Sequence, residues 1–167
     1  MVDSKDNLKE AFAGESQANR KYTYFAEKAE ASGNKQIARL FRATAEAENV
    51  HARNHLRVLG DIKSDKENLG AAIGGEYYEF TTMYPDFMNA AKAENNQEAL
   101  GTFNLANKVE QVHHKLFQAA LRNLEYGREI KDAPYYVCQT CGNTVEGEAP
   151  ERCPICGSPR DKFKKIE

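Results

Sequence analysis

Hydrophobic residues recur at spacings of three and four positions in four segments of the chain, which is the pattern of amphipathic α-helices. The pattern predicts helices over residues 5–31, 35–59, 69–93 and 97–126. Gly33 and Gly60 follow the first two helices and can adopt the left-handed conformation that ends a helix. Residues 60–68 lack this periodicity, and we expect them to form a crossover connection along a helical bundle.

Acidic and histidine residues interrupt each of the four hydrophobic stripes. The second and fourth stripes each contain a Glu-x-x-His motif, and the first and third each contain a glutamate in phase with hydrophobic residues. These residues are Glu15, Glu48, His51, Glu76, Glu110 and His113, and Glu79 flanks the third stripe. Because the same faces carry Phe12, Phe41 and Phe103, we expect the charged side chains to lie inside a bundle and not in solvent.

A pair of metal ions is the simplest partner for so many buried charges. Each unpaired buried ion would cost several kcal/mol, and no arginine or lysine lies on the stripes. Two divalent ions would nearly neutralise the five carboxylates, whereas one ion would not. A glutamate from each of two helices and Glu-x-x-His from the other two is the ligand pattern of dinuclear sites in four-helix bundles. The sequence therefore predicts an all-α four-helix bundle with a two-metal centre.

The two halves of this bundle repeat each other with one insertion. The Glu-x-x-His motifs lie 62 residues apart, whereas Glu15 and Glu76 lie 61 apart. Tyr22 comes seven residues after Glu15 and Tyr84 comes eight after Glu76, which places the extra residue between Glu76 and Tyr84. We predict a π-bulge in this interval, just before Pro85, whose missing amide hydrogen already interrupts the helical ladder.

Three polar residues near the stripes have no equivalent in the other half. His55 aligns with Phe117 and His114 with an alanine, so we favour hydrogen-bonded structural roles for both histidines. Glu79 also aligns with an alanine. A fifth carboxylate on one side only suggests a ligand that one metal can bind or release.

All four cysteines lie in two Cys-x-x-Cys-Gly motifs, and they are Cys138, Cys141, Cys153 and Cys156. Each motif can turn two thiolates inward, and its glycine allows a tight turn with backbone amides aimed at sulfur. The spacing predicts one tetrahedral zinc or iron ion, and attachment to a redox-capable centre favours iron. Tyr135 to Val137 and Phe163 are expected in short strands. We divide the chain into a bundle, residues 1–130, and a metal domain, residues 131–167.

Composition excludes several classes of function. A net charge of -2 and a pI near 6.1 give no basic face for nucleic acid, and no segment approaches the ~20 apolar residues of a membrane span. The N-terminal segment lacks the pattern of a signal peptide, and the clustered cysteines suit a reducing compartment. We expect a soluble, cytoplasmic protein with neither a nucleic-acid nor a membrane partner.

Together these motifs resemble the rubrerythrin family over essentially the whole chain. The stretches GESQANRKY, AEAENVHA, GEYYEFTTMYPDF and VEQVHH are similar to its ferritin-like di-iron domain, and the tail to its rubredoxin-like domain. The resemblance implies a peroxidase that reduces hydrogen peroxide to water and protects against oxidative stress. It also implies two non-haem irons, one iron on four cysteines, and a homodimer or larger assembly. An external reductase linked to NAD(P)H, or a rubredoxin, would supply electrons.

The resemblance further implies roles for individual ligands. Glu48 and Glu110 would bridge the irons, Glu15 would bind the first iron, and Glu76 with His113 would bind the second.

Four residues near the irons are expected to take part in the redox reaction. On reduction the first iron would exchange Glu79 for His51. Tyr22 and Tyr84 are candidates to hydrogen-bond ligands or bound oxygen, with core packing as an equal alternative. Whether the tail serves its own bundle or that of a partner is open from the residues, and the resemblance favours electron transfer between subunits of a head-to-tail dimer.

Other functions stay open. A ferritin-type protein that oxidises or stores iron uses similar ligands, although it does not need a four-thiolate tail. A non-enzymatic bundle with a zinc ribbon would also show both motifs. A di-iron oxygenase is less well supported, since the stripes show no obvious pocket for an organic substrate.

Overall fold

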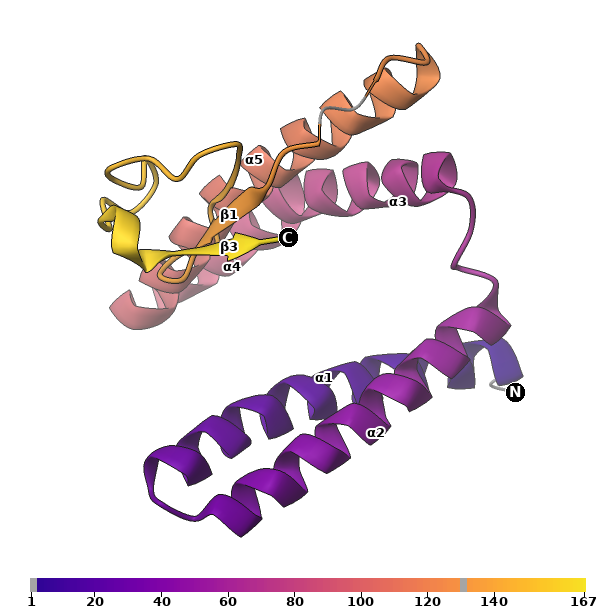
Figure 1. Ribbon diagram of the computed structural model, residues 1–167, viewed down its shortest axis with the longest axis vertical. Coiled ribbons are helices and arrows are strands. Elements are labelled where there is room, and N and C mark those ends of the chain that lie inside the picture. The colour runs from indigo at the N-terminus through magenta and orange to yellow at the C-terminus, as the bar shows by residue number, and fades with distance from the viewer. Residues whose placement is uncertain (1–2, 130–131) are drawn as a thin grey trace. The chain divides into compact units, whose positions relative to one another are not determined.

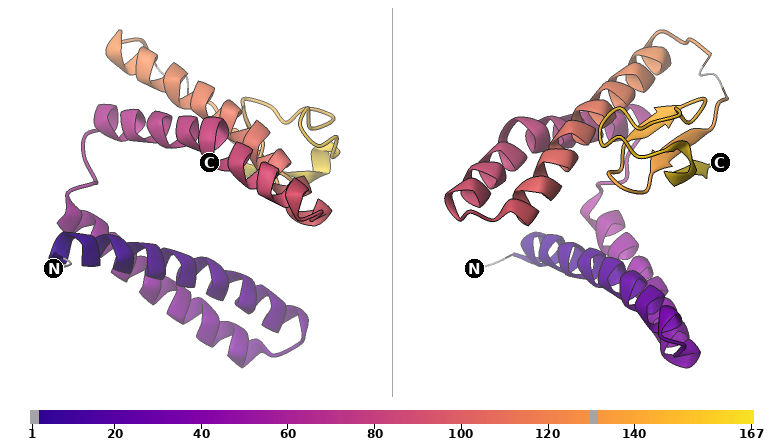
Figure 2. Two further views of the ribbon diagram at one scale, coloured as in Figure 1. Left: turned by 180° about the vertical axis from the view of Figure 1, so that it is seen from behind. Right: turned by 90° about the vertical axis from the view of Figure 1, so that its left-hand side faces the viewer.

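The computed structural model describes residues 3–129 and 132–167, which fall into two compact units, Met1–Lys63 and Ser64–Glu167. The first unit is a hairpin of α1 (Ser4–Ala31) and α2 (Lys35–Leu59). The second contains α3 (Asp65–Tyr78), the π-helical segment η1 (Glu79–Met83), α4 (Tyr84–Ala93), α5 (Gln97–Glu125) and a small sheet (Figures 1 and 2). The predicted class, a four-helix protein with a small four-cysteine domain, is confirmed. Among the described residues, no helix combines the length and hydrophobicity needed to cross a bilayer.

Small residues hold the α1–α2 hairpin together. Its buried positions are all alanines, namely Ala26, Ala29, Ala38, Ala45 and Ala52. Side chains without bulk let two helices approach closely, and Asn19 Nδ2 adds a 2.7 Å hydrogen bond to the carbonyl oxygen of Ala45. Gly33 and Gly60 have φ angles of 78° and 73°, so both helices end at left-handed glycines as predicted.

The predicted start of the third helix was wrong by four residues. The helix begins at Asp65, because Ser64 and Glu67 form a capping box in which Ser64 Oγ accepts from the Glu67 amide and Glu67 Oε2 accepts from the Ser64 amide. The expected crossover over residues 60–68 is therefore also wrong. Only residues 60–64 connect α2 to α3.

The predicted π-bulge is confirmed. Residues Glu79–Met83 form a π-helical turn between α3 and α4, inside the interval fixed by the repeat. A π-turn accommodates one additional residue without breaking the helix, so the residues on either side keep their faces.

Aromatic contacts preserve the internal repeat. The rings of Tyr22, Phe25 and Phe41 pack together in the first unit, and those of Tyr84, Phe87 and Phe103 pack in the second. Phe25 and Phe41 have ring centroids 5.5 Å apart, as do Phe87 and Phe103. Each unit therefore contains the same cluster of one tyrosine and two phenylalanines.

The four-cysteine module contains a three-stranded antiparallel sheet of order β2-β1-β3. Its strands are β1 (Tyr135–Cys138), β2 (Thr144–Glu146) and β3 (Phe163–Ile166). The first and third confirm the predicted strands, and β2 was not predicted. The module lies along α5 (Figure 1), where Gly142 faces the buried Val109. A Cβ atom on Gly142 would lie 3.7 Å from Val109 Cγ1, and its φ of 85° also favours glycine.

Candidate metal centres

Three predicted ligands meet on the first unit. Glu15 extends from α1, and Glu48 and His51 extend from successive turns of α2. His51 Nδ1 lies 2.9 Å from Glu48 Oε2 and 3.8 Å from Glu15 Oε1. One ligand atom from each residue lies within 4.8 Å of the other two. The Glu-x-x-His spacing produces this convergence because residues three apart lie on one helical face.

The second unit repeats this geometry with Glu76 from α3 and Glu110 and His113 from α5. His113 Nδ1 lies 2.8 Å from Glu110 Oε2 and 3.7 Å from Glu76 Oε2. Glu76 Oε2 is buried and has no hydrogen-bond partner among the described residues. A metal ion about 2.0–2.2 Å from each atom would fit this spacing and would satisfy that oxygen.

The pKa shifts in the second cluster also indicate that a bound cation would be favourable. Burial raises the pKa of Glu76 to about 7, and the negative charges of Glu110 and Glu79 add to the rise while His113 opposes it. A hydrogen bond with Glu110 raises the pKa of His113, although burial works in the opposite direction. The carboxylates therefore repel one another, and a bound cation would relieve that repulsion.

Glu79 lies beside this cluster on η1. It is not one of the three converging residues. Burial raises the pKa of its carboxyl group, and the negative charge of Glu110 adds to the effect, so the two carboxylates interact. The π-turn thus holds a further acidic group close to the cluster.

The two candidate tyrosines have different surroundings. Burial raises the pKa of the Tyr84 hydroxyl, followed by the charges of Glu110, Glu79 and Glu76, which places Tyr84 in the field of the second cluster. Tyr22 packs on Phe25 and Phe41, seven residues along α1 from Glu15.

His114 has a structural role. Its Nδ1 donates a 3.1 Å hydrogen bond to the carbonyl oxygen of Ile73, and its ring packs on Tyr77 and Phe80. It therefore ties α5 to α3. His55 is partly buried on α2 and belongs to neither ligand cluster.

The four cysteine sulfurs converge as predicted. The Sγ atoms of Cys138 and Cys156 lie 3.7 Å apart, and those of Cys141 and Cys153 lie 3.6 Å apart. A tetrahedral metal with sulfur ligands at about 2.3 Å has edges of about 3.8 Å, so the cluster fits one ion.

The two cysteine loops share one hydrogen-bond pattern. The amides of Gly142 and Gly157 each donate a 2.8 Å hydrogen bond, to the carbonyl oxygens of Cys138 and Cys153. Burial raises the pKa of Cys156, but contacts with the Ser158 side chain and amide outweigh this effect and lower that pKa to about 6. Burial raises the pKa of Cys141 instead, so Cys156 is the cysteine whose surroundings favour the thiolate, which is the form that binds metal.

One hydrogen bond connects the cysteine module to the second cluster. His113 Nε2 lies 3.0 Å from Thr144 Oγ1, and that hydroxyl donates a 3.2 Å hydrogen bond to the carbonyl oxygen of Gly142. Since the hydroxyl hydrogen is used in this way, Nε2–H is the donor to Thr144. The nitrogen that would bind a metal is therefore Nδ1, which without a metal is hydrogen-bonded to Glu110. Thr144 was not predicted, because no periodic pattern marks a contact between residues 31 positions apart.

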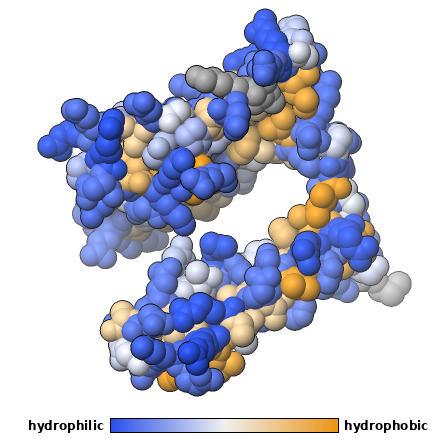
Figure 3. Space-filling model, in the orientation of Figure 1, coloured by the Kyte–Doolittle hydropathy of each residue, from blue (hydrophilic) through white to orange (hydrophobic). Residues whose placement is uncertain are grey.

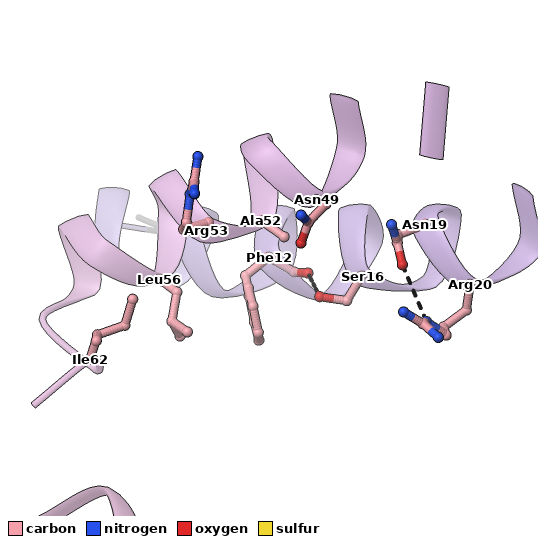
Figure 4. A pocket seen from close by; sticks show the side chains of 9 residues that line it. All are labelled: Phe12, Ser16, Asn19, Arg20, Asn49, Ala52, Arg53, Leu56 and Ile62. Carbon is pink, nitrogen blue, oxygen red and sulfur yellow. Dashed lines mark hydrogen bonds between the residues drawn. The ribbon is translucent and has the colours of Figure 1, made fainter. Parts of the chain in front are cut away.

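Two pockets differ in their relation to the ligands. A cavity of about 450 Å³ lies between α5 and the cysteine module, lined by Glu76, His113, Leu116, Phe117, Tyr135 and Thr144. A second pocket, of about 400 Å³, lies on the α1–α2 hairpin near Phe12, Leu56 and Arg53 (Figure 4). None of the predicted ligands lines the second pocket, so only the first opens onto a candidate metal centre.

Comparisons with known proteins find matches to both parts of the chain. The family model for rubrerythrin matches residues 6–121, and that for the rubrerythrin rubredoxin-like domain matches residues 136–164. Rubrerythrin-2 of Clostridium acetobutylicum is 38% identical, with 95% of this chain and 94% of the relative covered. Rubrerythrin of Nitratidesulfovibrio vulgaris is 35% identical, with 98% and 94% covered. A solved structure of fully reduced, all-ferrous nigerythrin matches with a TM-score of 0.59 and 35% identity, covering 99% of this chain and 88% of that one.

Proposed function

Because the chain belongs to the rubrerythrin family, we propose that it is a non-haem di-iron peroxidase that reduces hydrogen peroxide to water. As a member of that family it binds iron, and it combines a ferritin-like di-iron domain with a rubredoxin-like four-cysteine domain. The observation that carries the proposal is the hydrogen bond between these two parts at Thr144 and His113. Iron storage would not require a four-thiolate module in contact with a ligand of the other cluster.

The ligand roles follow the two clusters. Glu15 would serve the first iron, Glu76 with His113 would serve the second, and Glu48 and Glu110 would bridge them. When bound, two ferrous ions would supply the two electrons that cleavage of the oxygen–oxygen bond requires. The 450 Å³ cavity supports this proposal, since Glu76 and His113 line it and hydrogen peroxide is far smaller than the cavity.

Two residues would change with oxidation state. We propose that Glu79 and His51 alternate as ligands of the first iron. The side chain of His51 is 53% exposed, against 26% for His113, so protein atoms of its own unit surround His51 less closely. Glu79 lies on a π-turn, a distortion that often occurs at functional sites.

The tyrosines would orient the oxygen atoms of peroxide. Because burial and nearby carboxylates raise the pKa of Tyr84, its hydroxyl stays protonated at neutral pH and can donate a hydrogen bond. Tyr22 is its counterpart in the repeat, and we propose the same role for it.

Electrons would enter through the cysteine module. Cys141 is followed by Gly142, whose carbonyl oxygen accepts from Thr144, and Thr144 in turn accepts from His113. Two hydrogen bonds therefore link a cysteine ligand to a histidine ligand. This route lies within one chain, unlike the transfer between subunits that the family resemblance implied.

Replacing Thr144 with valine is expected to slow this transfer. Valine keeps the shape but loses the hydroxyl that holds His113, and loss of such a supporting hydrogen bond typically costs about 10–100-fold in activity or metal affinity. The measurement is the rate at which the reduced four-cysteine iron is oxidised after peroxide is added. Thr140→Val is the control, because Thr140 Oγ1 accepts from Ser158 within the module. Equal rates in both variants would show that the Thr144 contact carries no electrons.

Partners and location follow from the same proposal. We propose an external NAD(P)H-linked reductase or a rubredoxin as electron donor, a homodimer or larger assembly, and a role in the cytoplasm against oxidative stress. We also propose residues 1–130 and 131–167 as the two domains. The boundary between them lies outside the described residues.

Metal analysis and a visible spectrum test the proposal directly. Protein purified without added metal should contain iron in both kinds of site, and adding peroxide to the reduced protein should restore the colour of the ferric four-cysteine centre within the turnover time. Consumption and mineralisation of ferrous ion beyond two per bundle would indicate iron storage instead. Colourless protein with zinc on the cysteines would indicate a structural role.

A further inference from the structure

The ligand face of the α1–α2 hairpin is open. Ile37 and Leu40 lie about three turns before Glu48 and His51 on α2, and Val58 lies about two turns after His51, so all five share one face. Ile37, Leu40 and Val58 are 50%, 62% and 60% exposed. Figure 3 shows such hydrophobic residues at the surface of the hairpin. Since the described residues of this unit bury only alanines, its large hydrophobic side chains require another element to cover them.

Each unit also carries only half of a dinuclear ligand set. A two-metal centre in a four-helix bundle takes ligands from four helices, and each unit supplies ligands from two. The complement of the α1–α2 hairpin is therefore the α3–α5 hairpin, which carries the matching cluster of Glu76, Glu110 and His113.

The length of the connection between α2 and α3 decides whether the α3–α5 hairpin that covers α1–α2 comes from the same chain or from a second copy. In a ferritin-like bundle one long crossover places the end of the second helix and the start of the third at opposite ends. About eleven residues separate Glu48 from the end of α2, and about as many separate the start of α3 from Glu76, which is about 16 Å of helix on each side of the metals.

A crossover within one chain must therefore span about 33 Å. From Leu59 to Asp65 the chain extends at most about 22 Å. The connection is too short by about a third, so α2 cannot lead into α3 of the same ferritin-like bundle.

We propose that a second copy of this chain supplies the complementary hairpin. In this exchanged dimer α1–α2 of each chain packs on α3–α5 of the other, and two di-iron centres form, each with ligands from both chains. This inference rests on the dinuclear centre of the proposed function. The cysteine module remains on α5 of its own chain and reduces the centre through His113 of that chain.

Complementation between two inactive variants tests the exchange. One variant, Glu48→Ala with His51→Ala, lacks the ligands of α2, and the other, Glu110→Ala with His113→Ala, lacks those of α5. Each alone should hold about one iron per chain, on the cysteines, against about three for the natural sequence. In a mixed exchanged dimer one centre has no defect and the other has both. Random pairing after co-expression should restore about one quarter of the centres, or about 1.5 irons per chain.

A longer connection provides the matched control. Inserting ten glycine and serine residues between Asp61 and Ile62 lets one chain complete the crossover, and in that background the mixture should lose the regained iron. The same insertion between Gly127 and Arg128 should leave the regain unchanged. The iron on the four cysteines reports that each variant is folded.

The outcomes separate this inference from the proposed activity. If the mixture holds one iron per chain while the natural protein holds three, each chain closes its own bundle and the exchange is wrong, whatever the peroxidase activity. If the mixture regains iron but the natural protein does not reduce peroxide, the exchange stands and the proposed function fails. If either double variant lacks the cysteine iron, Glu48→Gln and Glu110→Gln replace the pair and are scored in the same way.

Discussion

Replacing Glu110 with alanine is expected to remove the di-iron centre and to lower peroxide reduction by at least about 100-fold. Glu110 Oε2 lies 2.8 Å from His113 Nδ1, and the Glu110 charge raises the pKa of Glu76, Glu79 and Tyr84. Among residues 3–129 and 132–167, none raises the pKa of more groups in the second cluster. Iron content and peroxide consumption are the measurements.

The same variant should change the stability of the metal-free protein little. Removing Glu110 relieves repulsion with the partly buried carboxyl group of Glu76, but it also removes the 2.8 Å hydrogen bond that raises the pKa of His113. Because the two effects oppose each other, the thermal midpoint of the metal-free variant should stay close to that of the natural sequence. Glu98→Ala in the first turn of α5 is the control, and it should retain iron and activity. Full iron content in Glu110→Ala would remove Glu110 from the ligand set.

The sequence predicts which residues gather in each cluster because two independent patterns agree. Hydrophobic phase places Glu48 and His51 on one face of their helix, and the repeat places Glu110 and His113 in the same way. Their role as metal ligands stays a prediction. Counting residues between Glu76 and Tyr84 also predicts the π-turn, since an insertion that preserves both faces has few other solutions.

The start of the third helix and the Thr144–His113 contact were not predicted, because neither leaves a hydrophobic pattern in the sequence. Hydrophobic periodicity starts at Leu69, but the helix starts at Asp65, because the capping box at Ser64 stabilises a first turn that carries no hydrophobic signal. Because the helix starts four residues earlier, the connection between α2 and α3 is too short to run along the length of a bundle. The Thr144 contact with His113 depends on how the cysteine module lies on α5, which local sequence does not specify.

Removing the redox activity of the cysteine module is expected to abolish steady-state peroxide reduction while leaving the single reaction of pre-reduced protein with peroxide intact. In Cys153→Ser, steady-state peroxide reduction driven by a reductase should fall at least about 100-fold, because a one-electron supply is lost. Chemically reduced protein should still consume one peroxide for each di-iron centre, since Glu15, Glu48, Glu76 and Glu110 are untouched. Stopped-flow mixing with peroxide measures the single turnover.

Loss of a cysteine also unfolds the module, so the variant alone does not distinguish electron transfer from lost contacts. Loading the natural protein with zinc on the four cysteines does. Zinc accepts the same tetrahedral thiolates but has no redox chemistry, so the sheet and the Thr144–His113 contact persist while electrons cannot pass. Steady-state reduction should therefore fall as far with zinc as in Cys153→Ser, with the single turnover intact. Turnover that survives zinc loading would mean that the reductase delivers electrons to the di-iron centre by another route.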